Sequence, residues 1–154
     1  MIENNISSED TKSYEDEMNA PTSYRLLLID DDHTLLKALP ETLRFRLQGC
    51  IVDTTDSPDE ALMLVGKQSY DAIISDIRMP GMDGVALTVK IREVQPATPV
   101  ILITGHGEND LRGQASAAGA FAFLNKPIDP IFIVALLQQA LHERRAQQTR
   151  SCAV

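Results

Sequence analysis

The sequence has no apolar run that approaches the roughly 20 residues of a membrane-spanning helix. Its first residues, MIENNISSEDTKSYEDE, are acidic and lack the basic and then apolar order of a secretory signal. Cysteine is scarce, since only Cys50 and Cys152 are present, so no disulfide framework is expected and a cytoplasmic location is predicted. Positive charge is also scarce. The net charge of −8 and the isoelectric point near 4.8 argue against direct binding to nucleic acid.

The negative charge is concentrated at the beginning of the chain. Residues 1–22 hold six acidic residues and one lysine, and they contain few aliphatic side chains. We therefore expect a disordered acidic leader over residues 1–22, with an acidic interaction arm as the functional alternative. Residues 147–154 are polar and are predicted to form a flexible tail. One domain of ordinary size remains, over residues 23–146.

Within residues 23–146, short apolar segments alternate with segments of helical periodicity. Nearly continuous apolar strands favour a parallel sheet that is buried on both faces. Right-handed connections then give a doubly wound α/β sandwich of the flavodoxin-like type, with five strands in the order 2-1-3-4-5. The predicted strands are Arg25–Asp30, Cys50–Thr54, Asp71–Asp76, Pro99–Thr104 and Ala120–Leu124. The predicted helices are His33–Gln48, Ser57–Gln68, Gly84–Val94, Glu108–Ala118 and Asp129–Ala146.

Pro40 conflicts with this pattern, because it lies well inside the first predicted helix. Proline removes a backbone donor and crowds the preceding turn. We therefore expect a kink or a late helix start at this position.

Polar side chains follow four of the five predicted strands. In open α/β sheets, ligands bind beyond the carboxyl ends of the strands, where the strand order reverses. With the order 2-1-3-4-5, the polar groups fall on one edge of the sheet near that point. They are Asp30, Asp31 and Asp32 at the end of the first strand, Asp76 at the end of the third, Thr104 at the end of the fourth and Lys126 shortly after the fifth.

Carboxylates that converge at one edge repel one another, and a divalent cation resolves that conflict. Mg²⁺ binds oxygen ligands and usually keeps several waters, so two carboxylates and a carbonyl are sufficient. Lys126 and Thr104 supply a cation and a hydroxyl for a phosphoryl group. A carboxylate can itself accept that group, and Asp76 is the best candidate, since it stands alone at the end of a central strand.

Each of these residues also has a purely structural interpretation. Asp30 or Asp32 can cap the first helix, Thr104 can simply end a strand, and Lys126 can be a solvated loop residue. Asp83, in the turn PGMDG, is a plausible N-cap of the following helix. The functional interpretation is favoured because all four groups occur at the ends of the expected strands.

Four segments make the sequence resemble the receiver domain of bacterial two-component response regulators. They are LLLIDDDHTLL, DAIISDIRMPGMDG, VILITGHG and FAFLNKPID, in this order, and the resemblance spans roughly residues 24–146. It implies that Asp76 accepts a phosphoryl group from a phosphohistidine of a sensor histidine kinase or phosphotransfer protein. It further implies that Mg²⁺ is held by Asp30, Asp31, Asp76 and the backbone carbonyl of Arg78, with Asp31 a direct ligand and Asp30 bound through water.

The resemblance also implies a switch and an output. Thr104 would form a hydrogen bond with a phosphoryl oxygen, and Lys126 would form an ion pair with the phosphoryl group. The Lys126–Pro127 peptide is expected to be cis. Phe123 occupies the position of the family's switch aromatic, where Tyr is commoner. Phosphorylation would reshape the surface of the fourth helix, fifth strand and fifth helix. That surface would act on a downstream effector protein or an output domain outside this sequence, or in a phosphorylation-dependent dimer.

Three alternatives remain open from the residues. The segment LLLIDDDHT also fits the first motif of haloacid-dehalogenase-type phosphohydrolases, with Asp30 as nucleophile and Asp32 as general acid/base. That interpretation leaves Asp76 and the PGMDG turn unexplained. A receiver fold that acts only as a binding module, without phosphorylation, is the second. The third concerns extent: the chain is either a stand-alone receiver or part of a larger regulator.

Overall fold

The computed structural model describes residues 23–105 and 109–151, so the predicted leader and His106, which follows the fourth strand, lie outside the described residues. Within these ranges, five strands alternate with five helices. In chain order the elements are β1 (Arg25–Ile29), α2 (His33–Arg46), β2 (Ile51–Thr55), α3 (Pro58–Lys67), β3 (Ala72–Asp76), α4 (Gly84–Val94), β4 (Val100–Thr104), α5 (Asn109–Ala117), β5 (Ala122–Asn125) and α6 (Pro130–Ser151).

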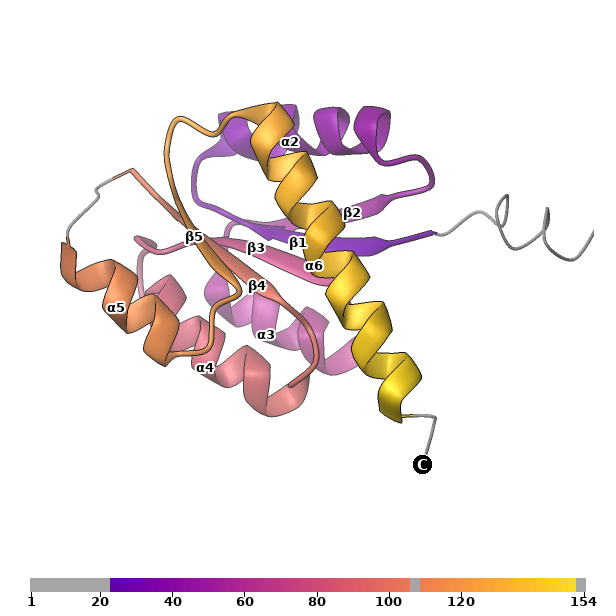
Figure 1. The fold of residues 1–154 in the computed structure, drawn as a ribbon. Helices are drawn as coiled ribbons and strands as arrows, with labels where there is room; N and C mark the ends of the chain where they lie inside the picture. The colour runs from indigo at the N-terminus through magenta and orange to yellow at the C-terminus, as the bar shows by residue number, and fades with distance from the viewer. Residues whose placement is uncertain (1–22, 106–108, 152–154) are drawn as a thin grey trace, which may run out of the picture.

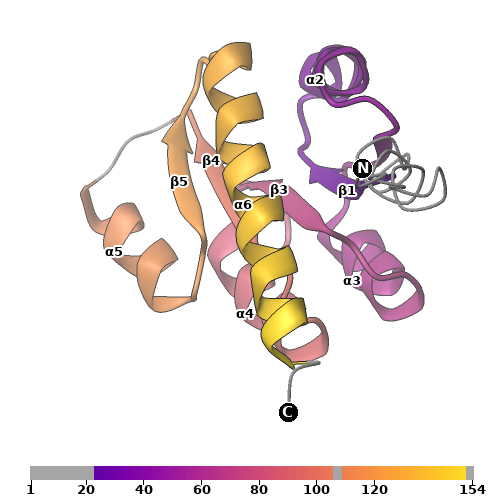
Figure 2. The same cartoon turned by 45° about the vertical axis from the view of Figure 1, so that its right-hand side comes forward.

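The strands form one parallel sheet in the order β2-β1-β3-β4-β5, which confirms the predicted flavodoxin-like α/β fold. Helices α2 and α6 cover one face of the sheet, and α3, α4 and α5 cover the other (Figures 1 and 2). No helix in the described part of the chain is long and apolar enough to cross a membrane.

The core consists of two apolar clusters, one on each face of the sheet. Alternation along β1 sends Leu26 and Leu28 towards α2 and α6, and Leu27 and Ile29 towards the other three helices. All four side chains are buried, and each such burial contributes about 1.5–3 kcal/mol to folding. The central strands β1, β3 and β4 are therefore rigid supports for whatever follows their carboxyl ends.

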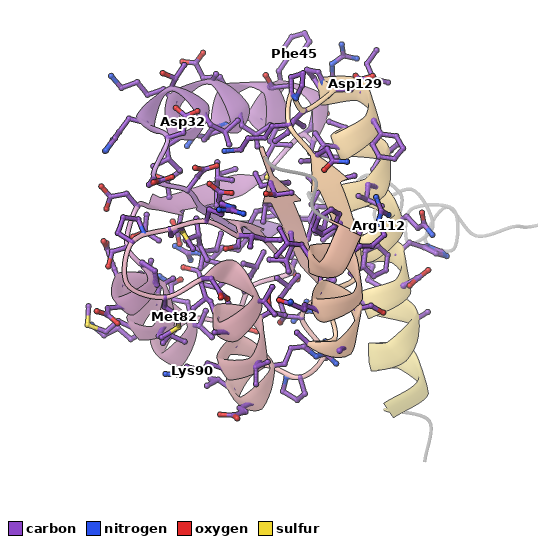
Figure 3. All side chains as sticks on the ribbon, turned by 90° about the vertical axis from the view of Figure 1, so that its left-hand side faces the viewer. Asp32, Phe45, Met82, Lys90, Arg112 and Asp129 are labelled. Atoms are coloured by element: carbon purple, nitrogen blue, oxygen red, sulfur yellow. The ribbon has the colours of Figure 1, made fainter. Side chains whose placement is uncertain are left out.

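The helix caps explain where the chain leaves the sheet. Asp32 caps α2, since its Oδ1 accepts the backbone N–H groups of Thr34 and Leu35 at 3.0 and 3.4 Å. Asp83 caps α4 as predicted, and its Oδ1 accepts the N–H of Ala86 at 2.7 Å. Figure 3 labels Asp32 at the beginning of α2. These caps hold the loops that follow β1 and β3 in fixed positions.

Two helices differ from the prediction. Helix α2 begins at His33 and contains Pro40. Of the two outcomes expected there, a kink or a late start, the late start does not occur, because capping by Asp32 and burial of Leu39 and Leu43 outweigh the missing donor. Helix α6 continues to Ser151 rather than ending at Ala146. The helix therefore includes residues 147–151 of the predicted tail, and residues 152–154 lie outside the described residues.

Candidate functional site

Three carboxylates meet at the carboxyl edge of the sheet. Asp30 and Asp31 follow β1, and Asp76 is the last residue of the neighbouring strand β3. One oxygen from each carboxylate lies within 4.8 Å of the others. Asp30 and Asp76 are buried, whereas Asp31 is exposed. The structure thus brings together the three acids that the sequence predicted, with an opening on the Asp31 side.

Lys126 is the cation that reaches into this group. Its Nζ lies 3.0 Å from Asp30 Oδ2 and 3.4 Å from Asp76 Oδ2. Asp30 Oδ1 accepts the Asp32 N–H at 2.9 Å, but within the described residues the buried Oδ2 accepts no hydrogen bond of good geometry. The Lys126 ammonium thus pairs with two buried carboxylates at once, so it does not neutralise both of them.

The pKa directions agree with that incomplete neutralisation. Burial raises the pKa of the Asp30 carboxyl and the charge of Asp76 raises it further, against the opposing effects of the Asp32 N–H and Lys126. Burial alone would lower the pKa of Lys126, but the two carboxylates outweigh burial and raise it. An incompletely compensated buried carboxylate beside an exposed one is an arrangement that a hard divalent cation fits.

The β3–α4 turn contributes a feature whose importance the sequence did not reveal. A Cβ atom on Gly84 would lie 2.3 Å from the carbonyl oxygen of Asp76, so only glycine permits this approach. The Gly84 N–H donates to the carbonyl of Ile77 at 2.7 Å. The turn therefore fixes the backbone of Asp76. Arg78, whose side chain is exposed, lies in the same turn.

Thr104 and Phe123 come from the neighbouring strands β4 and β5. Thr104 is fully buried at the end of β4, and its carbonyl accepts the Lys126 N–H at 2.8 Å. Leu102 pairs with Phe123 in the sheet, and Thr104 lies two residues beyond Leu102, so Thr104 and Phe123 share one face. The Lys126–Pro127 peptide is cis, as predicted.

The family comparison supplies the remaining observation. The family model of the response regulator receiver domain matches residues 26–138. This chain belongs to that family. A receiver domain is a signalling module rather than a classical enzyme, and the acidic group of Asp30, Asp31 and Asp76 is typical of its phosphoacceptor site. The hydrolase alternative is thereby excluded, in keeping with the capping role of Asp32.

Similar curated proteins are transcriptional regulators. The chain is 41% identical over 118 residues to the transcriptional regulatory protein GlrR of Escherichia coli K12, which covers 77% of this chain and 26% of that protein. It is 42% identical over 120 residues to the C4-dicarboxylate transport regulator DctD of Rhizobium meliloti, covering 78% and 26%. The chain therefore spans about a quarter of the length of these relatives.

Solved receiver structures have the same fold. A CheY-like receiver domain from Methanospirillum hungatei superposes with a TM-score of 0.78 at 25% identity, covering 82% of this chain and 99% of that one. The beryllofluoride-activated NtrC4 receiver domain, solved as a dimer, gives a TM-score of 0.73 at 32% identity, covering 78% and 98%.

Proposed function

We propose that this protein receives a phosphoryl group on Asp76 from a phosphohistidine of a sensor histidine kinase or phosphotransfer protein, with Mg²⁺ bound. The observation that carries the proposal is the placement of the Asp76 carboxylate, beside two further acids and 3.4 Å from the Lys126 ammonium. Asp76 ends a central strand whose five residues are all buried, so its position is fixed before the donor arrives.

The metal would be held by Asp31 directly, by Asp30 through water, by Asp76 and by the backbone carbonyl of Arg78. When bound, Mg²⁺ supplies positive charge to the acidic group and to the phosphoryl oxygens. The residues fit this role, because the buried oxygen of Asp30 has an ion pair but no hydrogen bond among the described residues.

In the transfer step, a carboxylate oxygen of Asp76 bonds to phosphorus while the bond from phosphorus to the donor's histidine nitrogen breaks. Lys126 counters the charge that spreads over the phosphoryl oxygens, and the Thr104 hydroxyl donates a hydrogen bond to one of them. Asp30 keeps the Lys126 ammonium at the site through the contact of 3.0 Å.

The output follows from the new charge. Phosphorylation adds about −1.5 to −2 units of charge and three acceptor oxygens beside Thr104. Thr104 moves towards them, Phe123 turns into the space that Thr104 leaves, and the surface of α5, β5 and α6 changes. A downstream effector protein, an attached output domain or a second phosphorylated copy reads this surface in the cytoplasm. The dimeric NtrC4 receiver and the regulators GlrR and DctD support this proposal.

Acetyl phosphate labelling in the presence of Mg²⁺ tests the proposal. Asp76→Asn is expected to abolish labelling, and beryllofluoride is expected to bind the wild-type protein only when Mg²⁺ is present. Persistent labelling of Asp76→Asn, together with its loss in Asp30→Asn, would overturn the assignment of Asp76. A wild-type protein that binds no beryllofluoride would show that the fold serves as a binding module alone.

A further inference from the structure

Helix α5 is attached to the sheet by few large side chains. Among its described side chains, residues 111–117, Leu111 and Ala115 belong to the apolar cluster on that face. A Cβ atom on Gly113 would meet nothing within 4 Å, so this part of the helix faces open space. The position of α5 therefore depends on a small number of contacts with β5.

One of these contacts joins a cation to the switch aromatic. The guanidinium carbon of Arg112 lies over the ring of Phe123, 5.1 Å from the ring centroid, which is a cation–π arrangement. Arg112 belongs to α5 and Phe123 to β5 (Figure 3 labels Arg112). Phenylalanine has no hydroxyl group, so a hydrogen bond cannot hold this ring in place.

Open space lies beside the ring. A surface pocket of about 170 Å³ between α5 and β5 is lined by Arg112, Ala115, Ser116 and residues 120–123. The ring of Phe123 is half-buried and packs against the apolar cluster on this face. The guanidinium of Arg112 therefore adds to the contacts that hold the ring in this position.

We propose that Arg112 is a positioning residue that opposes activation by holding Phe123 against α5. The inference rests on the proposed function, because it concerns the same switch. When Phe123 turns towards the space beside Thr104, it must leave the guanidinium, and the lost attraction adds to the cost of the active state. Arg112 thereby sets how much of the protein is active before any phosphoryl group binds.

The expected effect follows from linkage. The apparent affinity of a ligand that binds the active state increases when the free-energy difference between the inactive and active states becomes smaller. A cation–π contact at a solvent-exposed position corresponds to roughly a twofold to fivefold change in an equilibrium constant. If Arg112 acted only as a positive charge near the anionic ligand, its loss would weaken ligand binding. If Arg112 holds Phe123 in the inactive position, its loss strengthens binding, so the direction of the change distinguishes the two roles.

Titration of the full chain with beryllofluoride and Mg²⁺, followed by fluorine NMR, tests the inference. Arg112→Ala is expected to lower the half-saturating beryllofluoride concentration by about threefold, whereas Arg112→Lys, which keeps a cation, should stay near the wild-type value. In a Phe123→Leu background, Arg112→Ala should have no effect, since the ring is absent. Arg46→Ala, an exposed arginine at the end of α2, controls for the loss of one charge.

Failure of this inference can be distinguished from failure of the proposed function. If the wild-type protein binds beryllofluoride but Arg112→Ala leaves the affinity unchanged or weakens it, the inference alone is overturned. It is also overturned if Arg112→Ala acts equally in the Phe123→Leu background. Failure of the wild-type protein to bind would overturn the proposed function and the switch together.

Discussion

Acidic side chains lie at the carboxyl ends of the strands, where two are buried, and at the amino ends, where they are half-buried, and their charges are balanced differently at these two edges of the sheet. At the amino edge, Asp71 accepts the Arg25 N–H at 2.8 Å and pairs with Arg144, while Asp53 accepts the Tyr70 hydroxyl at 2.7 Å and pairs with Arg25 at 3.2 Å. Each acid there has its own cation and its own hydrogen bond. At the carboxyl edge, Asp30 and Asp76 share Lys126, and the exposed Asp31 lies beside them.

This difference separates a structural network from a reactive site. A buried polar group that is fully paired stabilises the fold and has no capacity left for a ligand. A surplus of charge costs stability and is kept where a ligand completes the pairing. Within the described residues, the unmatched buried atom at the amino edge is Arg144 Nε, on a guanidinium that already pairs with Asp71 through Nη1.

The largest effect is expected at the carboxyl edge. Lys126→Ala should slow phosphorylation by acetyl phosphate by roughly 100-fold to 1,000-fold, because the charge that stabilises the phosphoryl oxygens is lost. Lys90→Ala, which removes an exposed lysine from α4 (Figure 3), is the control and should leave the rate unchanged. Equal phosphorylation rates for the Lys126→Ala and wild-type proteins would contradict the assignment of the carboxyl edge as the reactive site.

A substitution in the β3–α4 turn should affect fold and site together. Gly84→Ala places a methyl group 2.3 Å from the Asp76 carbonyl oxygen, so we expect a loss of about 3 kcal/mol in the free energy of unfolding and slower labelling of Asp76. Gly66→Ala in α3, where the new Cβ would meet nothing within 4 Å, should instead stabilise by about 0.5–1 kcal/mol. Urea denaturation measures both changes.

At the amino edge, where the strands begin, a substitution should lower the stability of the fold and leave its function unchanged. The Gln95 side chain accepts the N–H of Tyr70 and the hydroxyl of Thr98, and donates to the carbonyls of Val65 and Gln68. Gln95→Ala removes the partner of the Tyr70 N–H and of the Val65 and Gln68 carbonyls, whereas the Thr98 hydroxyl still reaches the Tyr70 carbonyl, and it should cost about 2 kcal/mol of unfolding free energy. Beryllofluoride affinity should not change.

The matched control for Gln95 is Gln139→Ala, on the exposed side of α6, for which no loss of stability is expected. A Gln95→Ala protein with weakened beryllofluoride binding would contradict the separation of the two edges.

The smallest effect concerns the surplus charge itself. In the absence of Mg²⁺, Asp30→Asn should raise the free energy of unfolding by about 1 kcal/mol, since a buried carboxylate is removed. The raised pKa of Asp30 means that its charge destabilises the fold above the ordinary pKa of 3.8, and that this cost disappears as the pH falls through the raised value. The advantage of the asparagine should therefore be greatest near neutral pH.

Thermal unfolding with a chelator present, from neutral pH towards pH 4, checks this sign. A stability gain of Asp30→Asn over the wild type that grew as the pH fell would contradict the conclusion that the charge of Asp30 destabilises the fold. Asp31→Asn is the comparison, because Asp31 is exposed: it should reduce Mg²⁺ affinity with little change in stability.

Much of this arrangement was predictable from the sequence. Apolar runs that end in Asp30, Asp76 and Thr104 identified both the parallel strands and the edge where the polar groups meet, because parallel strands bring their carboxyl ends together. The positions of Asp31 and Lys126 followed from the same rule. These inferences depend on periodicity and chain direction, which a single sequence contains.

Other features depend on contacts between distant segments. Nothing local to Tyr70 or Gln95 indicates that they meet, since their partners lie up to 30 residues away in the chain. The close approach of Gly84 to Asp76 is likewise a tertiary contact. Of the kink or late start expected at Pro40, the late start does not occur, because capping and burial outweigh the local cost of proline.

The contacts of Asp71 with both Arg25 and Arg144 also anchor the last helix. They tie the first strand to α6, and the Arg145 guanidinium carbon lies 5.0 Å from the ring centre of Tyr24 beside them. Arg144 and Arg145 lie in the second half of α6, which continues past the beginning of β1 to Ser151 (Figure 1). The helix is therefore held at the amino ends of the strands, at a place separate from the acidic group at their carboxyl ends.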